Sequence, residues 1–240
     1  MFARSALPVL LCVLLCDALA GCGSDASGAP RATLFRFPAE DPDGSLFLAA
    51  PVFHVDHDGV PADGSLSQIS CLNYAGQGFP GCYGDHDGSD FMLSGGFATM
   101  DAGSASVVAA ADGVVVEVHD GEYDRCHASI AAIPNGGIDC AGNPIRANRV
   151  SIRHADGIVS EYLHMMRESV AVEVGQRVRC GEHLGLVGSS GRSSAPHVHF
   201  EVHDADGALL DPFAGPVTGP ESLWVEQDGP FGLPAQTCAG

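Results

Sequence analysis

The alternation of apolar and polar side chains predicts a β-strand at residues 197–203. Neighbouring residues of a strand face opposite sides of its sheet, whereas residues two apart share a side. Val198 and Phe200 would therefore point into a core, and His197 and His199 would lie side by side on the other face. Two adjacent imidazoles suit a metal site, although a His-x-His pair alone can equally be two solvated surface histidines.

The remaining apolar pattern predicts further short strands. Residues 106–118 are rich in Val and Ala and predict two buried strands joined at an Asp-Gly turn. Residues 149–154 and 158–164 alternate and predict two more strands, with Tyr162 and His164 on one face of the second. The 31 glycines and 15 prolines make the chain rich in turns, so β structure is favoured over helices.

Length and charge narrow the class of protein. The 240 residues suffice for one well-buried domain with extensions. There are 30 acidic and 11 basic side chains, all of the latter Arg, and the formal net charge is -19. Nucleic acids and anionic membrane surfaces both require basic surfaces, so this composition argues against either as a partner.

The N-terminal residues predict export. A basic residue near the start is followed by a short apolar stretch at 6–15, which is too short for a comfortable membrane-spanning helix. Leu-Ala-Gly-Cys at 19–22 resembles a bacterial lipobox, which implies that residues 1–21 are a lipoprotein signal peptide and that Cys22 carries lipid. The alternative is an ordinary secretory signal with a coincidental cysteine. The lipobox resemblance implies an exported chain, lipid-anchored to a bacterial membrane and facing the periplasm or the cell exterior.

The cysteines agree with an exported chain. Six remain after the signal and the lipidated residue, and an even number in such a chain predicts disulfides. Six cysteines allow about fifteen pairings, and a cysteine zinc site is the rival interpretation, although no Cys-x-x-Cys pair is present. The favoured pairing joins the cysteines closest in sequence and leaves one distant pair: Cys71–Cys82, Cys126–Cys140 and Cys180–Cys238.

An acidic, histidine-containing stretch upstream offers further metal ligands. His86 and Asp90 are four residues apart in a Gly-containing segment, so a turn must bring them together. A neutral imidazole and a carboxylate are both donors that Zn²⁺ accepts, although the same residues could form a surface turn. Residues 54–59 form a second possible cluster, but Asp-Gly stretches also make ordinary turns. Four other histidines are interpreted as non-functional: His119, His127, His183 and His203.

Four blocks in order resemble the lysostaphin-type (LytM-domain) zinc metallopeptidases. Residues 86–91 resemble the His-x-Gly-x-Asp-Phe element of that family, and residues 162–164 resemble its Tyr-x-His element. The glycines of 174–191 resemble its glycine ladder, and residues 195–201 resemble its Pro-His-x-His-Phe-Glu signature. The resemblance covers about residues 80–213; each block is weak alone, and their order makes the set specific.

The resemblance implies an all-β domain, built as an antiparallel sheet with a substrate groove, short turns and disulfide-bounded loops. It implies that His86, Asp90 and His199 hold one Zn²⁺ and that His164 and His197 lie beside it and handle protons. Three protein ligands leave a fourth position for water, as catalytic zinc requires. Strand alternation alone does not distinguish the roles of His197 and His199.

The implied function is a zinc metalloendopeptidase that hydrolyses the peptide cross-links of bacterial peptidoglycan. The alternative is a non-catalytic LytM-like module that binds or activates other wall hydrolases. The partners would be peptidoglycan peptide stems, with the membrane reached through the lipid anchor only, and we expect a monomer. The predicted domains are a tether and extension at 22–65, the LytM-like domain at 66–216 and a Gly/Pro-rich tail at 217–240. We expect Trp224 to pack on the surface and Cys238 to pin the tail back.

Overall fold

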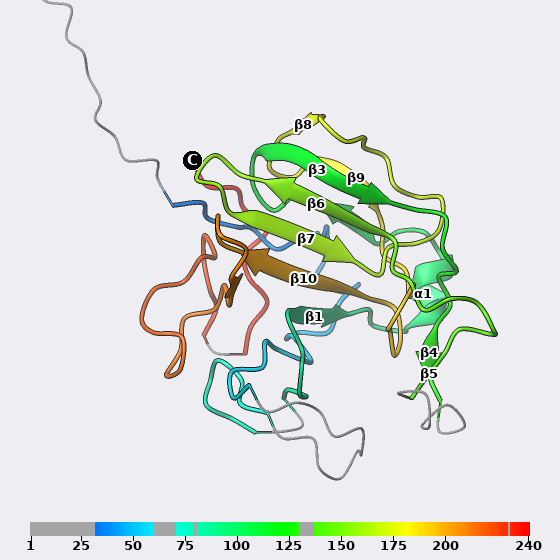
Figure 1. Ribbon diagram of the computed structural model, residues 1–240, viewed down its shortest axis with the longest axis horizontal. Coiled ribbons are helices and arrows are strands. Elements are labelled where there is room, and N and C mark those ends of the chain that lie inside the picture. Colours follow the sequence, from blue (N-terminus) through cyan, green and yellow to red (C-terminus); the bar gives the residue numbers. More distant parts are fainter. Residues whose placement is uncertain (1–31, 60–70, 79–80, 130–136, 230) are drawn as a thin grey trace, which may run out of the picture.

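A computed structural model describes residues 32–59, 71–78, 81–129, 137–229 and 231–240. Its centre is a seven-stranded antiparallel sheet in the order β1-β10-β7-β6-β3-β8, with β11 pairing β10 (Figure 1). The predicted all-β, antiparallel fold is therefore confirmed. The strands of this sheet are β1 (Ser89–Met92), β3 (Gly113–His119), β6 (Arg149–Arg153), β7 (Val159–Leu163), β8 (Arg177–Val178), β10 (His197–His203) and β11 (Leu209–Leu210).

Two small sheets and one short helix flank the large sheet. β2 (Ser106–Val108) pairs with β9 (His183–Leu186), and β4 (His127–Ala128) pairs with β5 (Ile138–Asp139). The helix α1 (Phe97–Asp101) is the only α-helix among the described residues. No helix in this described part is both long and apolar enough to cross a membrane.

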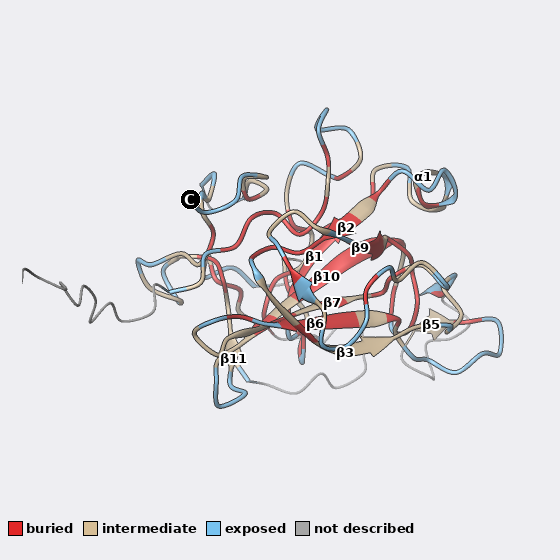
Figure 2. Ribbon diagram, turned by 90° about the horizontal axis from the view of Figure 1, so that it is seen from above, coloured by how far each residue is buried: buried red, intermediate tan, exposed pale blue. Residues whose placement is uncertain are grey.

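Strand β10 separates the core of the protein from its polar face. Val198, Phe200 and Val202 are fully buried and pack with Tyr162 of β7 and Ile152 of β6 in one apolar cluster. These strands carry the buried centre of the molecule in Figure 2. The histidines of β10 occupy the opposite face, as the alternation predicts, so core packing fixes the direction in which they point.

The two strands predicted at 106–118 form, but they do not pair with each other. β2 pairs with β9, whereas β3 pairs with β6 and β8. The chain changes sheet at Gly113, where an added Cβ would lie 2.4 Å from Ile152 Cγ2 and 2.8 Å from the Arg153 carbonyl oxygen. This close crossing over β6 replaces the predicted hairpin, and only glycine fits there.

Both flanks of the predicted LytM-like domain belong to the same core. Phe35 forms a parallel bridge with Trp224, and its ring contacts Phe200 edge-on at 5.5 Å. Trp224 is 2% exposed, so the prediction that it lies on the surface is wrong. The indole fills the space between Phe200 and Phe213, whose ring centroids lie 5.4 and 5.2 Å away. The described part of the predicted 22–65 extension is thus structural rather than only a tether.

Three disulfides join the cysteines in the favoured pairing, and the one between Cys180 and Cys238 holds the C-terminal tail against the domain. Cys22 and the predicted signal peptide lie outside the described residues. Of the other two bonds, Cys71–Cys82 closes a short loop before β1 and Cys126–Cys140 closes a short loop after β3. All three link the following cysteines: Cys71–Cys82, Cys126–Cys140 and Cys180–Cys238.

Candidate metal centre

Strand pairing brings Asp90 and His199 together. In the antiparallel register of β1 and β10, Asp90 lies directly opposite His199. The Asp90 Oδ1 atom is 2.7 Å from His199 Nδ1 and 3.2 Å from His197 Nε2. Asp90 and both histidines are at most 6% exposed. Directly opposed residues of an antiparallel pair have neighbouring Cβ atoms, so this contact follows from the register itself.

A turn then places His86 against the same carboxylate. Its Nε2 atom lies 3.2 Å from Asp90 Oδ1. On the other side of the ring, Nδ1–H donates to the His54 carbonyl oxygen at 2.7 Å, and the His86 carbonyl accepts a hydrogen bond from the Asp56 N–H at 2.8 Å. A hydrogen on Nδ1 leaves the lone pair of Nε2 pointing at the centre, which is the tautomer that a metal ligand needs.

Gly88 allows this turn to approach β10. A Cβ at this position would lie 2.6 Å from His199 Nε2 and 2.7 Å from the Phe200 carbonyl oxygen. Any side chain would therefore collide with the ring and the backbone of β10. The glycine between His86 and Asp90 serves close packing, which is the reason that the sequence needs it there.

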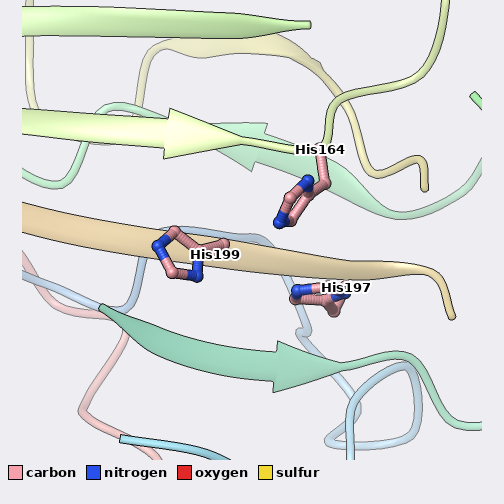
Figure 3. A group of neighbouring side chains, drawn as sticks. All are labelled: His164, His197 and His199. Carbon is pink, nitrogen blue, oxygen red and sulfur yellow. The ribbon is translucent and has the colours of Figure 1, made fainter. Parts of the chain in front are cut away.

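His164 and His197 complete the cluster from two different elements. His164 follows the end of β7 and His197 begins β10; their ring centroids are 4.6 Å apart, and Figure 3 shows both rings on the side of β10 that carries His199. His164 Nδ1–H donates to the Ser190 carbonyl at 2.6 Å, and His197 Nδ1–H donates to the Ala195 carbonyl at 2.7 Å. Both rings thus turn Nε2 toward the centre.

The electrostatics of the cluster follow from burial and proximity. Burial alone raises the pKa of the Asp90 carboxyl, but the charge and hydrogen bonds of the surrounding histidines, led by His197, outweigh it and hold that pKa well below its usual range. Burial, followed by repulsion from His197 and His199, lowers the pKa of His164 well below its usual value. His164 is therefore neutral at pH 7, with the lone pair of Nε2 available as an acceptor.

His199 lies between two carboxylates. Its Nδ1 faces Asp90, and its Nε2 is 2.9 Å from Glu201 Oε1. Burial on its own lowers the pKa of His199, but the hydrogen bonds to Asp90 and Glu201 prevail and raise it to about 10. A metal ligand must lose this proton, so a cation bound by Nδ1 would replace the proton, with Glu201 still holding the far side of the ring.

The donor set fits a divalent transition metal. His86, Asp90 and His199 each offer one ligand atom, and these atoms lie within 4.8 Å of one another. Two imidazoles and one carboxylate are ligands that Zn²⁺ takes in three-ligand sites. Within the described part of the chain, two other sets of side chains place their ligand atoms equally close together: His164, His197 and His199; and Glu161, Glu201 and His203.

All five residues predicted for the site from the sequence therefore meet at one place, and their individual roles stay predictions. The 54–59 stretch does not form a ligand cluster, because His54 packs on Tyr74 at 4.4 Å and His57 pairs with Asp211 at 2.7 Å. Sequence reasoning missed Glu201, although it shares a face with His197 and His199 two residues away. It also missed the backbone carbonyls that orient the rings, which no side-chain pattern reveals.

The sequence profile described as peptidase family M23 matches residues 85–212, more than half of the 240-residue chain. The chain belongs to peptidase family M23. The matched region of this M23 peptidase domain contains all five clustered residues, whereas the buried flanks that include Phe35 and Trp224 lie outside it.

Several bacterial proteins share part of this M23 domain. The peptidoglycan DD-endopeptidase ShyC of Vibrio cholerae is 39% identical over 59 residues, which is 25% of this chain and 13% of that protein. The cell division protein DipM of Caulobacter vibrioides is 42% identical over 73 residues, which is 30% of this chain and 12% of that protein. The DD-carboxypeptidase/endopeptidase Mpg of Neisseria meningitidis is 36% identical over 104 residues, which is 35% of this chain and 23% of that protein.

The M23 chain thus spans less than a quarter of the length of each of these three relatives. Among solved structures, the catalytic domain of the prophage-encoded M23 protein EnpA from Enterococcus faecalis is 26% identical. That likeness covers 65% of this chain and 96% of the EnpA chain, with a TM-score of 0.38.

Proposed function

We propose that the protein is a zinc metalloendopeptidase that hydrolyses peptide cross-links of bacterial peptidoglycan. The convergence of His86, Asp90 and His199, with two further histidines turning Nε2 toward the same point, carries the proposal. Membership of peptidase family M23 supports peptide hydrolysis, and relatives named peptidoglycan endopeptidases support the substrate class. The groove that would receive the substrate stays a prediction.

His86 Nε2, Asp90 Oδ1 and His199 Nδ1 would hold the ion. Zn²⁺ bound there would polarise the scissile carbonyl and lower the pKa of a water molecule toward about 7. The chain then handles the protons. His164 is neutral, with hydrogen on Nδ1, so its Nε2 accepts the proton that the attacking water loses.

His197 is suited to the complementary role. Its Nδ1–H is held by the Ala195 carbonyl, and its Nε2 faces the Asp90 carboxylate at 3.2 Å, so acceptor oxygens lie on both sides of the ring. We infer that His197 donates a hydrogen bond to the developing oxyanion and a proton to the leaving amine.

The deciding experiment is mass spectrometry of purified peptidoglycan incubated with the protein, with and without a chelator. We expect new free stem peptides that disappear with chelation and return with added Zn²⁺. His199→Ala should lose both bound zinc and cleavage, whereas His197→Ala should keep most of the zinc and lose cleavage. If the peptidoglycan stayed intact after incubation with zinc-loaded protein, the proposed endopeptidase activity would be refuted.

The non-catalytic alternative predicts a different result. A binding or activating module would leave the wall intact by itself and increase cleavage by an added wall hydrolase, and His197→Ala would not change that increase. The arrangement of His164 and His197 favours the enzyme, because a binding module needs no neutral histidine beside its metal ligands.

Export and lipid anchoring through Cys22 are part of the same proposal. The lipobox-like residues 19–22 support it, and an extracytoplasmic location would place the protein beside its substrate. Cell fractionation tests it: the wild-type protein should be found with membranes, and Cys22→Ser should release it. A Cys22→Ser protein that stayed with membranes would contradict the anchor.

A further inference from the structure

Asn148 immediately precedes β6 and is fully buried, with every polar group of its side chain hydrogen-bonded. Its Nδ2 donates to the carbonyls of Met165 at 3.0 Å and Glu122 at 3.1 Å, and its Oδ1 accepts from the Glu122 N–H at 2.8 Å. Its backbone N–H donates to Ser190 Oγ at 2.9 Å, and its carbonyl accepts from the Met165 N–H at 3.1 Å.

Two of these partners, Met165 and Ser190, also position His164. Met165 is the next residue in the chain, and Asn148 bonds both its N–H and its carbonyl. Ser190 supplies the carbonyl that accepts the Nδ1–H of His164 at 2.6 Å, and its hydroxyl also donates to the Met165 carbonyl at 3.0 Å. Asn148, Met165 and Ser190 therefore form a closed set of hydrogen bonds around the histidine.

His164 needs such a support because its backbone is strained. Its φ of 64° lies in the left-handed region, which a histidine occupies at an energetic cost and retains only where the surroundings enforce it. Without the bonds to Met165, the chain after β7 could relax to an ordinary conformation. The ring would then leave both the Ser190 carbonyl and the centre.

We propose that Asn148 is the positioning residue of His164, fixing its backbone through Met165 and its ring through Ser190. Only an amide supplies the two donors and one acceptor that these partners use. An aspartate would turn an oxygen toward the carbonyls of Met165 and Glu122. The effect on turnover rests on the proposed function, whereas the effect on the ring of His164 does not.

The main test is a double-mutant cycle of Asn148→Asp and His164→Ala on zinc-loaded full-length protein. We expect Asn148→Asp to lower kcat by about 10–100-fold, with KM and zinc content close to wild type. In the His164→Ala background, Asn148→Asp should cause no further loss, because the group that it positions is already gone. Equal losses in both backgrounds would overturn the proposal.

The second readout is independent of activity. In ¹⁵N spectra of histidine-labelled protein, we expect His164 to carry its hydrogen on Nδ1 in the wild type. In Asn148→Asp that single tautomer should give way to a mixture or to broadened signals. If His164→Ala itself retained full turnover, the proposed role of His164 would fail, and these spectra alone would decide whether Asn148 orients the ring.

A matched control separates positioning from general destabilisation. Ser160 is also fully buried and hydrogen-bonded, to His154 Nε2 at 2.9 Å and Tyr162 Oη at 3.1 Å, but it lies on the core face of β7. Ser160→Ala should lower the unfolding temperature and leave kcat and the His164 spectrum unchanged. If Asn148→Asp does not fold, Ser190→Ala replaces it, since it removes two bonds of the set; an unchanged kcat and His164 spectrum in that variant would refute the proposal.

Discussion

Replacing Gly88 by alanine should disrupt the metal centre through one contact. The new Cβ would lie 2.6 Å from His199 Nε2 and 2.7 Å from the Phe200 carbonyl oxygen. Unstrained contacts require about 3.5 Å, so roughly 0.9 Å must be gained on both sides. The Phe200 backbone cannot retreat easily, because it is paired with Ser89 and its ring is fully buried. The imidazole of His199 must therefore turn away from Asp90 and Glu201.

The expected cost is about 1–3 kcal/mol in the free energy of unfolding, from overpacking. Zinc affinity should fall by about 10–100-fold, because one ligand is displaced. Competition against a chelating dye measures the affinity, and chemical denaturation measures the stability.

Gly78→Ala is the matched control for Gly88→Ala, since among the described residues its Cβ would meet only the Cys71 carbonyl, at 3.8 Å. This control should retain wild-type zinc affinity. A Gly88→Ala protein with wild-type zinc affinity and turnover would refute the steric reasoning.

Three further predictions concern residues around the site and in the core. Burial lowers the pKa of His154. Below about pH 6.5 the unfolded chain therefore takes up a proton that the folded chain does not bind, and the free energy of unfolding should fall as the pH drops. His154→Gln should weaken this fall in denaturation curves measured across pH 5–8 on chelator-treated protein. Glu201→Gln removes the charge behind His199 Nε2 and should weaken zinc binding by about 10-fold, which the same dye competition measures, whereas unchanged affinity would mean that the carboxylate has no such role. Replacing Cys126 and Cys140 together by serine opens a loop with a sequence separation of 14 and should lower the free energy of unfolding by about 3 kcal/mol. If reductant did not change the stability of the wild-type protein, that result would argue against this disulfide.

The sequence predicts the two faces of β10 well, because the period of two is imposed by the backbone. Its prediction that Tyr162 and His164 share a face is wrong, because Tyr162 is buried in the core cluster whereas His164 follows the end of β7 with a φ of 64° and lies beside His197. The alternation at β10 correctly assigns Phe200 to the core and His199 to the polar face. It fails at β2 and β3, which it joins in a hairpin. A turn between two strands does not reveal that the strands belong to different sheets. Here the close crossing of Gly113 over β6 places β2 and β3 in different sheets, and that contact links residues about forty positions apart.

The flanks are hard to place from the sequence for a related reason. Neither the extension at 22–65 nor the Gly/Pro-rich tail at 217–240 contains a long periodic run. In the structure, Phe35 and Trp224 meet over Phe200, so two segments at opposite ends of the chain complete the core beneath the metal centre. Apolar residues in an irregular segment can thus be core residues whose partners are distant in sequence.

The features of the candidate site likewise fall into those that a local sequence pattern reveals and those that depend on contacts between distant residues. The spacing of His86 and Asp90 and the His-x-His pair identify the groups that can hold a cation, because residue type determines ligand chemistry. The tautomer of each ring depends instead on the backbone carbonyls of His54, Ser190 and Ala195. The identity of the side chains in the ligand motif does not reveal these carbonyls. Substitutions that spare every predicted ligand should therefore still change the chemistry of the site, and Asn148 is where this separation between holding the metal and orienting the histidines can be measured.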